Sequence, residues 1–211
     1  MKLDRVYREI LYRVYEEGEA FMSQREVSKA CGVSIGLVNL LVSRMEGLGA
    51  VERRPMGFRV IVPKKMLQHW AARRNLKRDL VYSTFVPEPA EEIEGSLREG
   101  VFTAYSGCRL RFGLEEDYSE VYFYGDPKAV RALYPPSPHA PNLHVLTPDP
   151  HLTFRSKDSV APLPQLYVDL WQLGRPAERW LMELEERMEA AQGGDLEEVG
   201  WISGMSCKEE V

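Results

Sequence analysis

Cysteine is scarce in this chain, which has three, Cys31, Cys108 and Cys207, among 211 residues. An odd number of widely separated cysteines gives neither a disulfide framework nor the close spacing of a zinc site. The four histidines are not spaced as a metal-binding pair on one helix face either. We therefore expect a protein of the reducing cytoplasm that carries no metal and no other cofactor.

Long hydrophobic runs are also missing. No window approaches the ~20 apolar residues that a helix needs to cross a bilayer. The first ten residues, MKLDRVYREI, form an amphipathic segment that contains acidic residues, unlike the apolar core of a signal peptide. We therefore expect a globular protein without a membrane partner.

The net charge of −5 hides an uneven distribution along the chain. Residues 1–78 hold 16 Lys and Arg against 8 Asp and Glu, a net charge of +8, whereas residues 79–211 hold 11 against 24, a net charge of −13. One explanation is that such blocks of like charge are simply the solvent-exposed faces of helices. A basic half joined to an acidic half also suits two different partners, and the basic half favours nucleic acid if it folds accordingly.

Helix signals are clear near the N-terminus. Apolar side chains at helical spacing predict a helix over residues 4–17. Ser23 and Glu26 have the spacing of a capping box, which starts a second helix at Gln24. Gly32 is expected to end this short helix.

A third helix and a hairpin are predicted next. Ser34 caps the helix, which we expect to run to about Leu48 before a glycine stops it. Two short extended runs, residues 51–54 and 58–61, then flank the turn residues 55–57. Runs of this kind around a Pro/Gly turn are typical of a β-hairpin.

This order of elements is that of a winged helix-turn-helix, so we expect residues 1–63 to form a domain that binds double-stranded DNA. On a helical wheel, the apolar residues of the third helix share one broad face that must pack in the core. They are Leu37, Val38, Leu41, Val42, Met45 and Leu48. The opposite face would then enter the major groove.

Several residue types on that outer face can contact DNA. Asn39 can bond an adenine edge with both amide groups, Ser43 can reach bases or phosphates, and Leu40 can meet a thymine methyl. Each can equally be an ordinary exposed residue. Arginines around the hairpin turn would reach phosphates or the minor groove. The predicted DNA-contacting residues are Ser34, Gly36, Asn39, Leu40, Ser43, Arg44, Arg53, Arg54, Arg59, Lys64 and Lys65. For Lys64 and Lys65, pairing with the acidic half is the alternative.

The rest of the chain mixes helical and extended patterns. We expect a basic helical connector over residues 64–86 and a break at the Pro87-Glu88-Pro89 segment. An α+β domain for a partner or effector would follow over residues 87–192, and a loosely ordered tail over 193–211. Helices are predicted at 64–80, 90–99, 127–133, 163–173 and 176–191, and strands at 120–124 and 143–146. The expected fold class is α+β overall.

A motif in the second half resembles a known family. Residues 160–170 read VAPLPQLYVDL and residues 174–178 read GRPAE. This resembles a segment near the end of AbiEi-like proteins, the antitoxins of type IV toxin–antitoxin systems, in which V-x-P-x-Q-x-Y-x-D-L precedes G-R and an amphipathic helix. These proteins also begin with a winged helix-turn-helix. The resemblance covers residues 1–62 and about 160–190.

The resemblance implies a DNA-binding regulator that represses its own operon. In antitoxin members it also implies a nucleotidyltransferase toxin as partner. Within the motif we single out Gln165, Tyr167, Asp169 and Arg175 as a partner-binding or structural set. We expect Asp169 to pair with Arg175 or Arg179 across the bend at Gly174, because a polar bridge between two helices explains these residues better than catalysis does.

Other classes of function remain open. The C-terminal domain could catalyse nucleotidyl transfer, although the sequence lacks a Gly-Ser pair followed by the Asp-x-Asp carboxylates that would hold magnesium. The winged helix could bind a protein instead of DNA, although the hairpin arginines favour DNA. We predict no catalytic residue and leave a small-molecule effector and a homodimer open. The sequence does not indicate the operator or the regulated genes.

Overall fold

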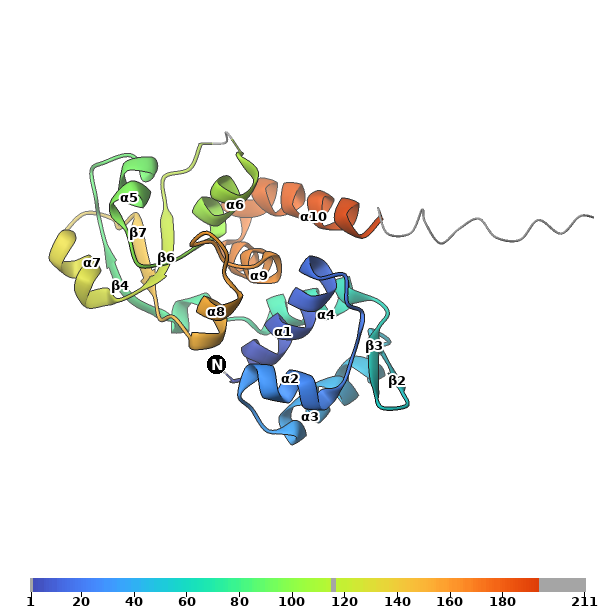
Figure 1. Ribbon diagram of the computed structural model, residues 1–211. Coiled ribbons are helices and arrows are strands. Elements are labelled where there is room, and N and C mark those ends of the chain that lie inside the picture. The colour runs from blue at the N-terminus through green and yellow to red at the C-terminus, as the bar shows by residue number, and fades with distance from the viewer. Residues whose placement is uncertain (1, 115–116, 194–211) are drawn as a thin grey trace, which may run out of the picture.

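The computed structural model describes residues 2–114 and 117–193 (Figure 1). Helices and strands alternate irregularly, which confirms the mixed α+β class. In chain order they are α1 (Lys2–Glu16), β1 (Phe21–Met22), α2 (Gln24–Cys31), α3 (Ile35–Gly47), β2 (Val51–Arg54), β3 (Gly57–Val60), α4 (Pro63–Arg73), the 3-10 helix η1 (Leu76–Arg78), β4 (Leu80–Thr84), α5 (Ala90–Ser96), β5 (Gly100–Thr103), α6 (Ala104–Phe112), β6 (Val121–Gly125), α7 (Pro127–Leu133), β7 (Leu143–Leu146), α8 (Pro150–Arg155), α9 (Leu163–Leu173), the 3-10 helix η2 (Arg175–Ala177) and α10 (Glu178–Gly193).

The helix boundaries near the N-terminus follow the predicted signals. Ser23 Oγ accepts from the N–H of Glu26 at 3.1 Å, and Glu26 Oε2 accepts from the N–H of Ser23 at 2.9 Å, so the capping box is confirmed. Gly32 ends α2 in the left-handed conformation, with φ 61°. Ser34 Oγ accepts from the N–H of Leu37 at 3.3 Å and starts α3.

The first sheet consists of the predicted hairpin and one further short strand. β2 and β3 pair antiparallel, and β1 pairs with the other edge of β3. The two residues of β1 were not predicted, because a strand this short has no period to detect. A Cβ at Gly57 would lie 2.5 Å from the backbone oxygen of Met22, so glycine permits the close approach of β1.

The second sheet has the strand order β4-β7-β6-β5, with β6 and β7 parallel and the other pairs antiparallel. The predictions for β6 and β7 are confirmed. The prediction of one helix over residues 64–80 is wrong at its end, since α4 stops at Arg73 and Leu80 begins β4. β5, α6 and α8 were not predicted.

Helices cover both faces of the second sheet (Figure 1). Side chains of α5 and α7 pack on one face with Val121, Phe123 and Val145. The other face belongs to a larger core that α6 and α9 share with the first half of the chain. α6 approaches α9 closely at Gly107, where a Cβ would lie 2.4 Å from Leu166 Cδ2.

The large core runs through the predicted domain boundaries. Buried side chains of α1, α3, α4, α9 and α10 belong to one cluster, which extends from Val6 to Met188. A further contact joins the halves at the start of α9, where Glu16 Oε1 of α1 accepts from the N–H of Leu163 at 2.8 Å. The division of tasks between residues 1–63, 64–86 and 87–192 stays a prediction. The predicted loose tail lies outside the described residues from 194 onward.

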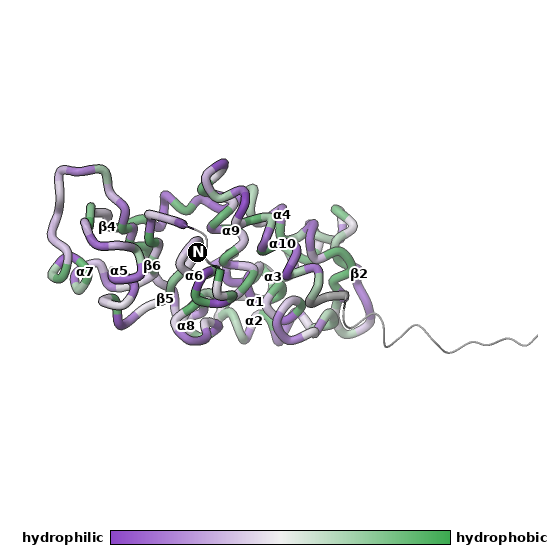
Figure 2. Tube along the Cα trace, turned by 90° about the horizontal axis from the view of Figure 1, so that it is seen from above, coloured by the Kyte–Doolittle hydropathy of each residue, from purple (hydrophilic) through white to green (hydrophobic). Residues whose placement is uncertain are grey.

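The molecule is elongated. The second sheet with α5 and α7 lies at one end and the β2–β3 hairpin at the other, with α1, α4, α9 and α10 between them (Figures 1 and 2). Among the described residues, no helix combines the length and the apolar character that crossing a membrane requires.

Candidate nucleic-acid interface

The two faces of α3 differ as predicted, except at its end. Val38, Leu41, Val42 and Met45 are buried. The opposite side exposes the predicted contact residues Gly36, Asn39, Leu40, Ser43 and Arg44. The prediction that Leu48 packs in the core is wrong: its side chain is 46% exposed, because α3 ends at Gly47 and the chain turns away.

Arg53 of β2 lies across the exposed face of α3. Its guanidinium donates to Asn39 Oδ1 at 2.9 Å and to Ser43 Oγ at 2.5 Å, and Nε donates to Glu46 at 2.8 Å. Gln24 at the start of α2 also donates to Asn39 Oδ1, at 3.3 Å. The hairpin, α2 and α3 thus meet at one polar surface around Asn39.

The three hairpin arginines do not lie on one face of the sheet. Arg59 pairs with Glu52 in the strand register, and Arg54 donates to Glu52 at 2.7 Å, so these two arginines share a face. Side chains alternate along a strand, which places Arg53 on the face toward α3. All three side chains are exposed.

A surface hollow of about 380 Å³ lies between the hairpin and the starts of α2 and α3. Arg25, Arg53 and Arg54 line it, together with the capping residue Ser23. Arg25 is an exposed residue of the first turn of α2 that the sequence analysis missed. Its position two residues after a helix cap was the available signal, because such a side chain lies beside helix N–H groups that favour anions.

Lys64 and Lys65 at the start of α4 have different surroundings. Lys64 Nζ donates to Glu185 at 3.1 Å and to Glu189 at 2.7 Å, both in α10. A phosphate would therefore have to replace these carboxylates. Lys65 is exposed and donates to the backbone oxygen of Leu48 at 3.3 Å.

A buried polar network is centred on Asp169 of α9. Asp169 is fully buried and accepts from Arg74 at 3.0 Å, Thr103 at 2.9 Å, Tyr124 at 2.6 Å and Gln165 at 2.9 Å. The expected pairing of Asp169 with Arg175 or Arg179 is wrong, because α9 turns this carboxylate toward α4 and the second sheet. Burial, followed by the neighbouring carboxylate of Asp169, raises the pKa of Tyr124 well above its ordinary value.

The other residues of the motif have separate roles. Gln165 Oε1 accepts from Arg8 Nε of α1 at 2.8 Å, so Gln165 connects the network to the first helix. Tyr167 donates to Glu185 of α10 at 2.7 Å. Arg175 is exposed in η2.

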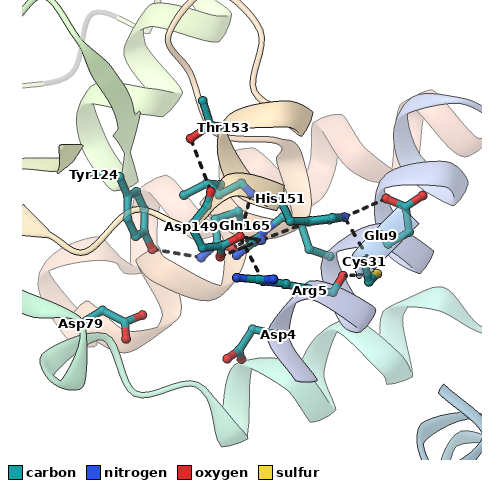
Figure 3. Close-up of polar contacts among 12 residues, drawn as sticks. Asp4, Arg5, Glu9, Cys31, Asp79, Tyr124, Asp149, His151, Thr153 and Gln165 are labelled. Atoms are coloured by element: carbon teal, nitrogen blue, oxygen red, sulfur yellow. Dashed lines mark hydrogen bonds and ion pairs between the residues drawn. The ribbon is translucent and has the colours of Figure 1, made fainter. Parts of the chain in front are cut away.

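A second buried cluster joins α1 to α8 (Figure 3). Glu9 is fully buried and accepts from Arg13 at 2.8 Å, Arg155 at 2.5 Å and His151 at 2.9 Å. Arg8 lies 3.1 Å from His151 Nδ1. Because arginine can only donate, Nδ1 accepts and Nε2–H donates to Glu9.

Protonation in this cluster follows from burial and hydrogen bonding. Burial alone would raise the pKa of Glu9, but the hydrogen bonds from His151, Arg155 and Arg13 outweigh it and lower the pKa to about 2. Burial lowers the pKa of His151 below its ordinary value, against the opposing hydrogen bond to Glu9. The pair therefore consists of a carboxylate and a neutral imidazole at neutral pH.

Cys31 completes a Cys-His-Glu group that does not suit nucleophilic chemistry. Its Sγ lies 4.0 Å from His151 Nε2, the same atom that contacts Glu9. In a nucleophile–base–acid arrangement the acid binds the other ring nitrogen, which here faces Arg8. Burial also raises the pKa of Cys31 to about 12, and the side chain is 2% exposed. These contacts serve to join α1, α2 and α8.

Most of these partners cannot be recognised from the sequence. Arg8, Glu9, Tyr124, Asp149 and His151 gave no signal as a group, because they lie far apart in the chain. Arg74 was recognised only as part of the basic stretch. Comparisons with family models, with curated proteins and with solved structures give no match for this chain.

Proposed function

We propose that the chain is a cytoplasmic, DNA-binding transcription regulator whose residues 1–63 act as a winged helix-turn-helix. In this proposal α2 and α3 are the helix-turn-helix, α3 is the recognition helix, and the β2–β3 hairpin is the wing. The element order, the exposed polar side of α3 and the net positive charge of residues 1–78 support it.

One observation carries the proposal. Arg53 of the hairpin contacts Asn39 and Ser43 on the exposed side of α3, so base-reading and phosphate-binding groups lie within hydrogen-bonding distance of each other. The hollow lined by Arg25, Arg53 and Arg54 lies beside them. A duplex that places its major groove on α3 brings a backbone phosphate to these arginines.

The contacts of Asn39 suggest how base reading would proceed. A bidentate contact with adenine needs Oδ1 as acceptor and the amide NH₂ as donor. In the free protein Oδ1 accepts from Arg53 and Gln24. We propose that Arg53 turns to a phosphate when DNA binds and releases Oδ1 for the adenine amino group.

We propose that residues 87–192 form an interaction or sensing domain rather than an enzyme. The AbiEi-like resemblance and the buried use of Gln165 and Asp169 support a structural role for the motif. By that resemblance, the protein represses its own operon and has a nucleotidyltransferase toxin as partner. A small-molecule effector and a homodimer are further partners that the resemblance does not imply.

The hairpin arginines test the proposal. We expect Arg53→Ala, Arg54→Ala and Arg59→Ala each to weaken binding to operator and to random duplex alike. Each lost phosphate contact should flatten the slope of log K against log salt by about one. Anisotropy titrations at several salt concentrations measure this, with Arg175→Ala as the control because Arg175 is an exposed cation of η2. An unchanged slope in all three hairpin variants would exclude the proposed wing contact.

A separate prediction concerns sequence reading by α3. Asn39→Ala should weaken binding to the preferred site by about 1–3 kcal/mol and leave binding to random duplex nearly unchanged. The two affinities are compared at one salt concentration, after circular dichroism shows that the variant is folded. Gln68→Ala is the control, because it removes an exposed amide of α4 that is not among the predicted DNA-contacting residues. Equal losses of Asn39→Ala on both duplexes would mean that Asn39 only positions the protein.

A further inference from the structure

A second hollow, of about 500 Å³, lies where the two halves of the chain meet. Residues of η1 and of the C-terminal end of α9 border it, and residues of β4, β6 and β7 of the second sheet close its third side. Its apolar lining is formed by Leu76, Leu80, Leu146 and Leu173. Its volume falls within the range of sites for small organic ligands, which often lie between domains.

Two stacked rings form part of the wall. The ring centroids of Tyr122 and His144 lie 4.6 Å apart at 19°. His144 Nδ1 lies 3.1 Å from Ser83 Oγ, whereas its buried Nε2 has no hydrogen-bond partner among the described residues. The wall thus combines a flat aromatic surface with a polar atom whose bonding is incomplete.

The charges that line this hollow are positive. Arg74 and Lys77 are its charged residues, and no carboxylate is among its lining side chains in the described part of the chain. Arg74 is already held by Asp79 and Asp169, at 2.5 and 3.0 Å. Lys77 is exposed at the rim, so its ammonium group can pair with an incoming anion.

We propose that this hollow binds a small amphiphilic carboxylate. Its apolar body, aromatic or aliphatic, packs on the leucines and on the Tyr122 ring, and its carboxylate pairs with Lys77. When the Ser83 hydroxyl donates to His144 Nδ1, the imidazole carries its proton on Nε2. A ligand oxygen that reaches Nε2 after a small ring movement then completes the bonding of His144.

A neighbouring hollow limits how far an anionic ligand can extend beyond Lys77. That hollow shares Lys77, Tyr122, Gln172 and Leu173 with the proposed site and adds the carboxylates of Asp117 and Glu120. A cationic ligand is attracted to those carboxylates, beyond Lys77. The same carboxylates repel an anion, so they confine a carboxylate ligand to the side of Lys77 and the leucines.

The position of the site links it to the rest of the molecule. η1 follows α4 directly, and the opposite wall belongs to β7 and α9. A ligand therefore contacts both halves of the chain at once. An influence of the ligand on DNA rests on the proposed function, so binding itself is measured on the full chain without DNA.

The test uses three probes with the same phenyl body and different charge: phenylacetate, phenylacetamide and phenethylammonium. Saturation-transfer NMR and titration of the imidazole resonances of the full-length protein report binding. We expect phenylacetate to bind, to shift the His144 resonances and to compete with octanoate. Weaker binding is expected for the amide, and the weakest for the cation. Tighter binding of the cation, or no binding of either carboxylate, would overturn the proposal.

Two variants of adjacent residues locate the site. Lys77→Gln removes the cation at the rim, and we expect the Kd of phenylacetate to rise about fivefold, as for a partly exposed ion pair. Arg78→Gln removes the next cation of η1, which is not among the residues that line either hollow, and should leave the Kd unchanged. Equal effects of the two variants would mean that phenylacetate responds only to overall charge, and the site would be rejected.

Discussion

Replacing Asp169 with alanine should lower the free energy of unfolding by about 3–5 kcal/mol, the usual cost of removing one partner from a buried ion pair. The carboxylate is fully buried and accepts hydrogen bonds from Arg74, Thr103, Tyr124 and Gln165. Without it, Arg74 keeps only Asp79 as an ionic partner among the described residues, and the buried hydroxyl groups of Thr103 and Tyr124 lose an acceptor. Urea unfolding followed by circular dichroism measures the loss.

The control distinguishes the observed network from the pairing expected from sequence. Arg175→Ala should change the free energy of unfolding by less than about 0.5 kcal/mol, since Arg175 is exposed and lies outside the network. Asp169→Asn keeps the shape of the side chain and removes its charge. The free energy of unfolding should fall less than in Asp169→Ala and more than in Arg175→Ala. Similar losses in Asp169→Ala and Arg175→Ala would contradict the network.

Acid should destabilise the protein through the cluster around Glu9. The folded pKa of Glu9 is about 2, against an ordinary value of 4.5. Its contribution to stability is therefore complete above pH 4.5 and is lost as the pH falls toward 2, because the unfolded chain then binds a proton that the folded chain does not. A difference of this size corresponds to about 3 kcal/mol.

Protonation of His151 also lowers the free energy of unfolding as the pH falls, and it does so at a higher pH than protonation of Glu9. Its pKa is lowered in the folded protein, so from about pH 6.5 downward the unfolded chain takes up a proton first. We expect the free energy of unfolding to begin to fall near pH 6.5 and to fall further below pH 4.5. Urea unfolding at a series of pH values measures both parts.

Substitutions at the two carboxylates near Arg155 assign the acid effect. Glu9→Gln should have a lower free energy of unfolding at pH 7 and should lose less of it between pH 4.5 and pH 2.5 than the unchanged protein. Asp149 and Glu26, whose pKa values are also lowered, still contribute to the loss in the variant. Glu17→Gln is the matched control, because Glu17 is an exposed partner of the same Arg155 at 3.2 Å. It should keep the pH dependence of the unchanged protein. A Glu9→Gln variant with the full loss below pH 4.5 would assign the acid effect to other groups.

The parts of the fold that could be predicted are those set by neighbouring residues. The capping box of α2 and the cap of α3 involve groups within three residues of each other, so their sequence signals are complete. β1 and α8 have two and six residues and are too short to show a period. Leu80 was assigned to a helix because its strand partner, Leu146, is 66 positions away.

Only those parts of the candidate interface that depend on neighbouring residues could be predicted. The exposed side of α3 follows from the helical period alone, which placed Asn39 and Ser43 correctly. The separation of Arg53 from Arg59 depends on the register of two strands, which the sequence does not reveal. The buried networks depend on contacts such as Arg8 with Gln165, 157 positions apart, and no local pattern encodes them.

The position of Arg8 and Glu9 on the first helix has a consequence for synthesis. α1 leaves the ribosome before the other described elements, and apart from Arg13 in the same helix, the partners of Arg8 and Glu9 are made much later, at His151, Arg155 and Gln165. At about 5–20 residues per second, that interval is roughly 8 to 30 s. During this time Glu9 has Arg13 as its partner within α1, and we expect α1 to dock against α8 and α9 only after residues 151–165 have been translated.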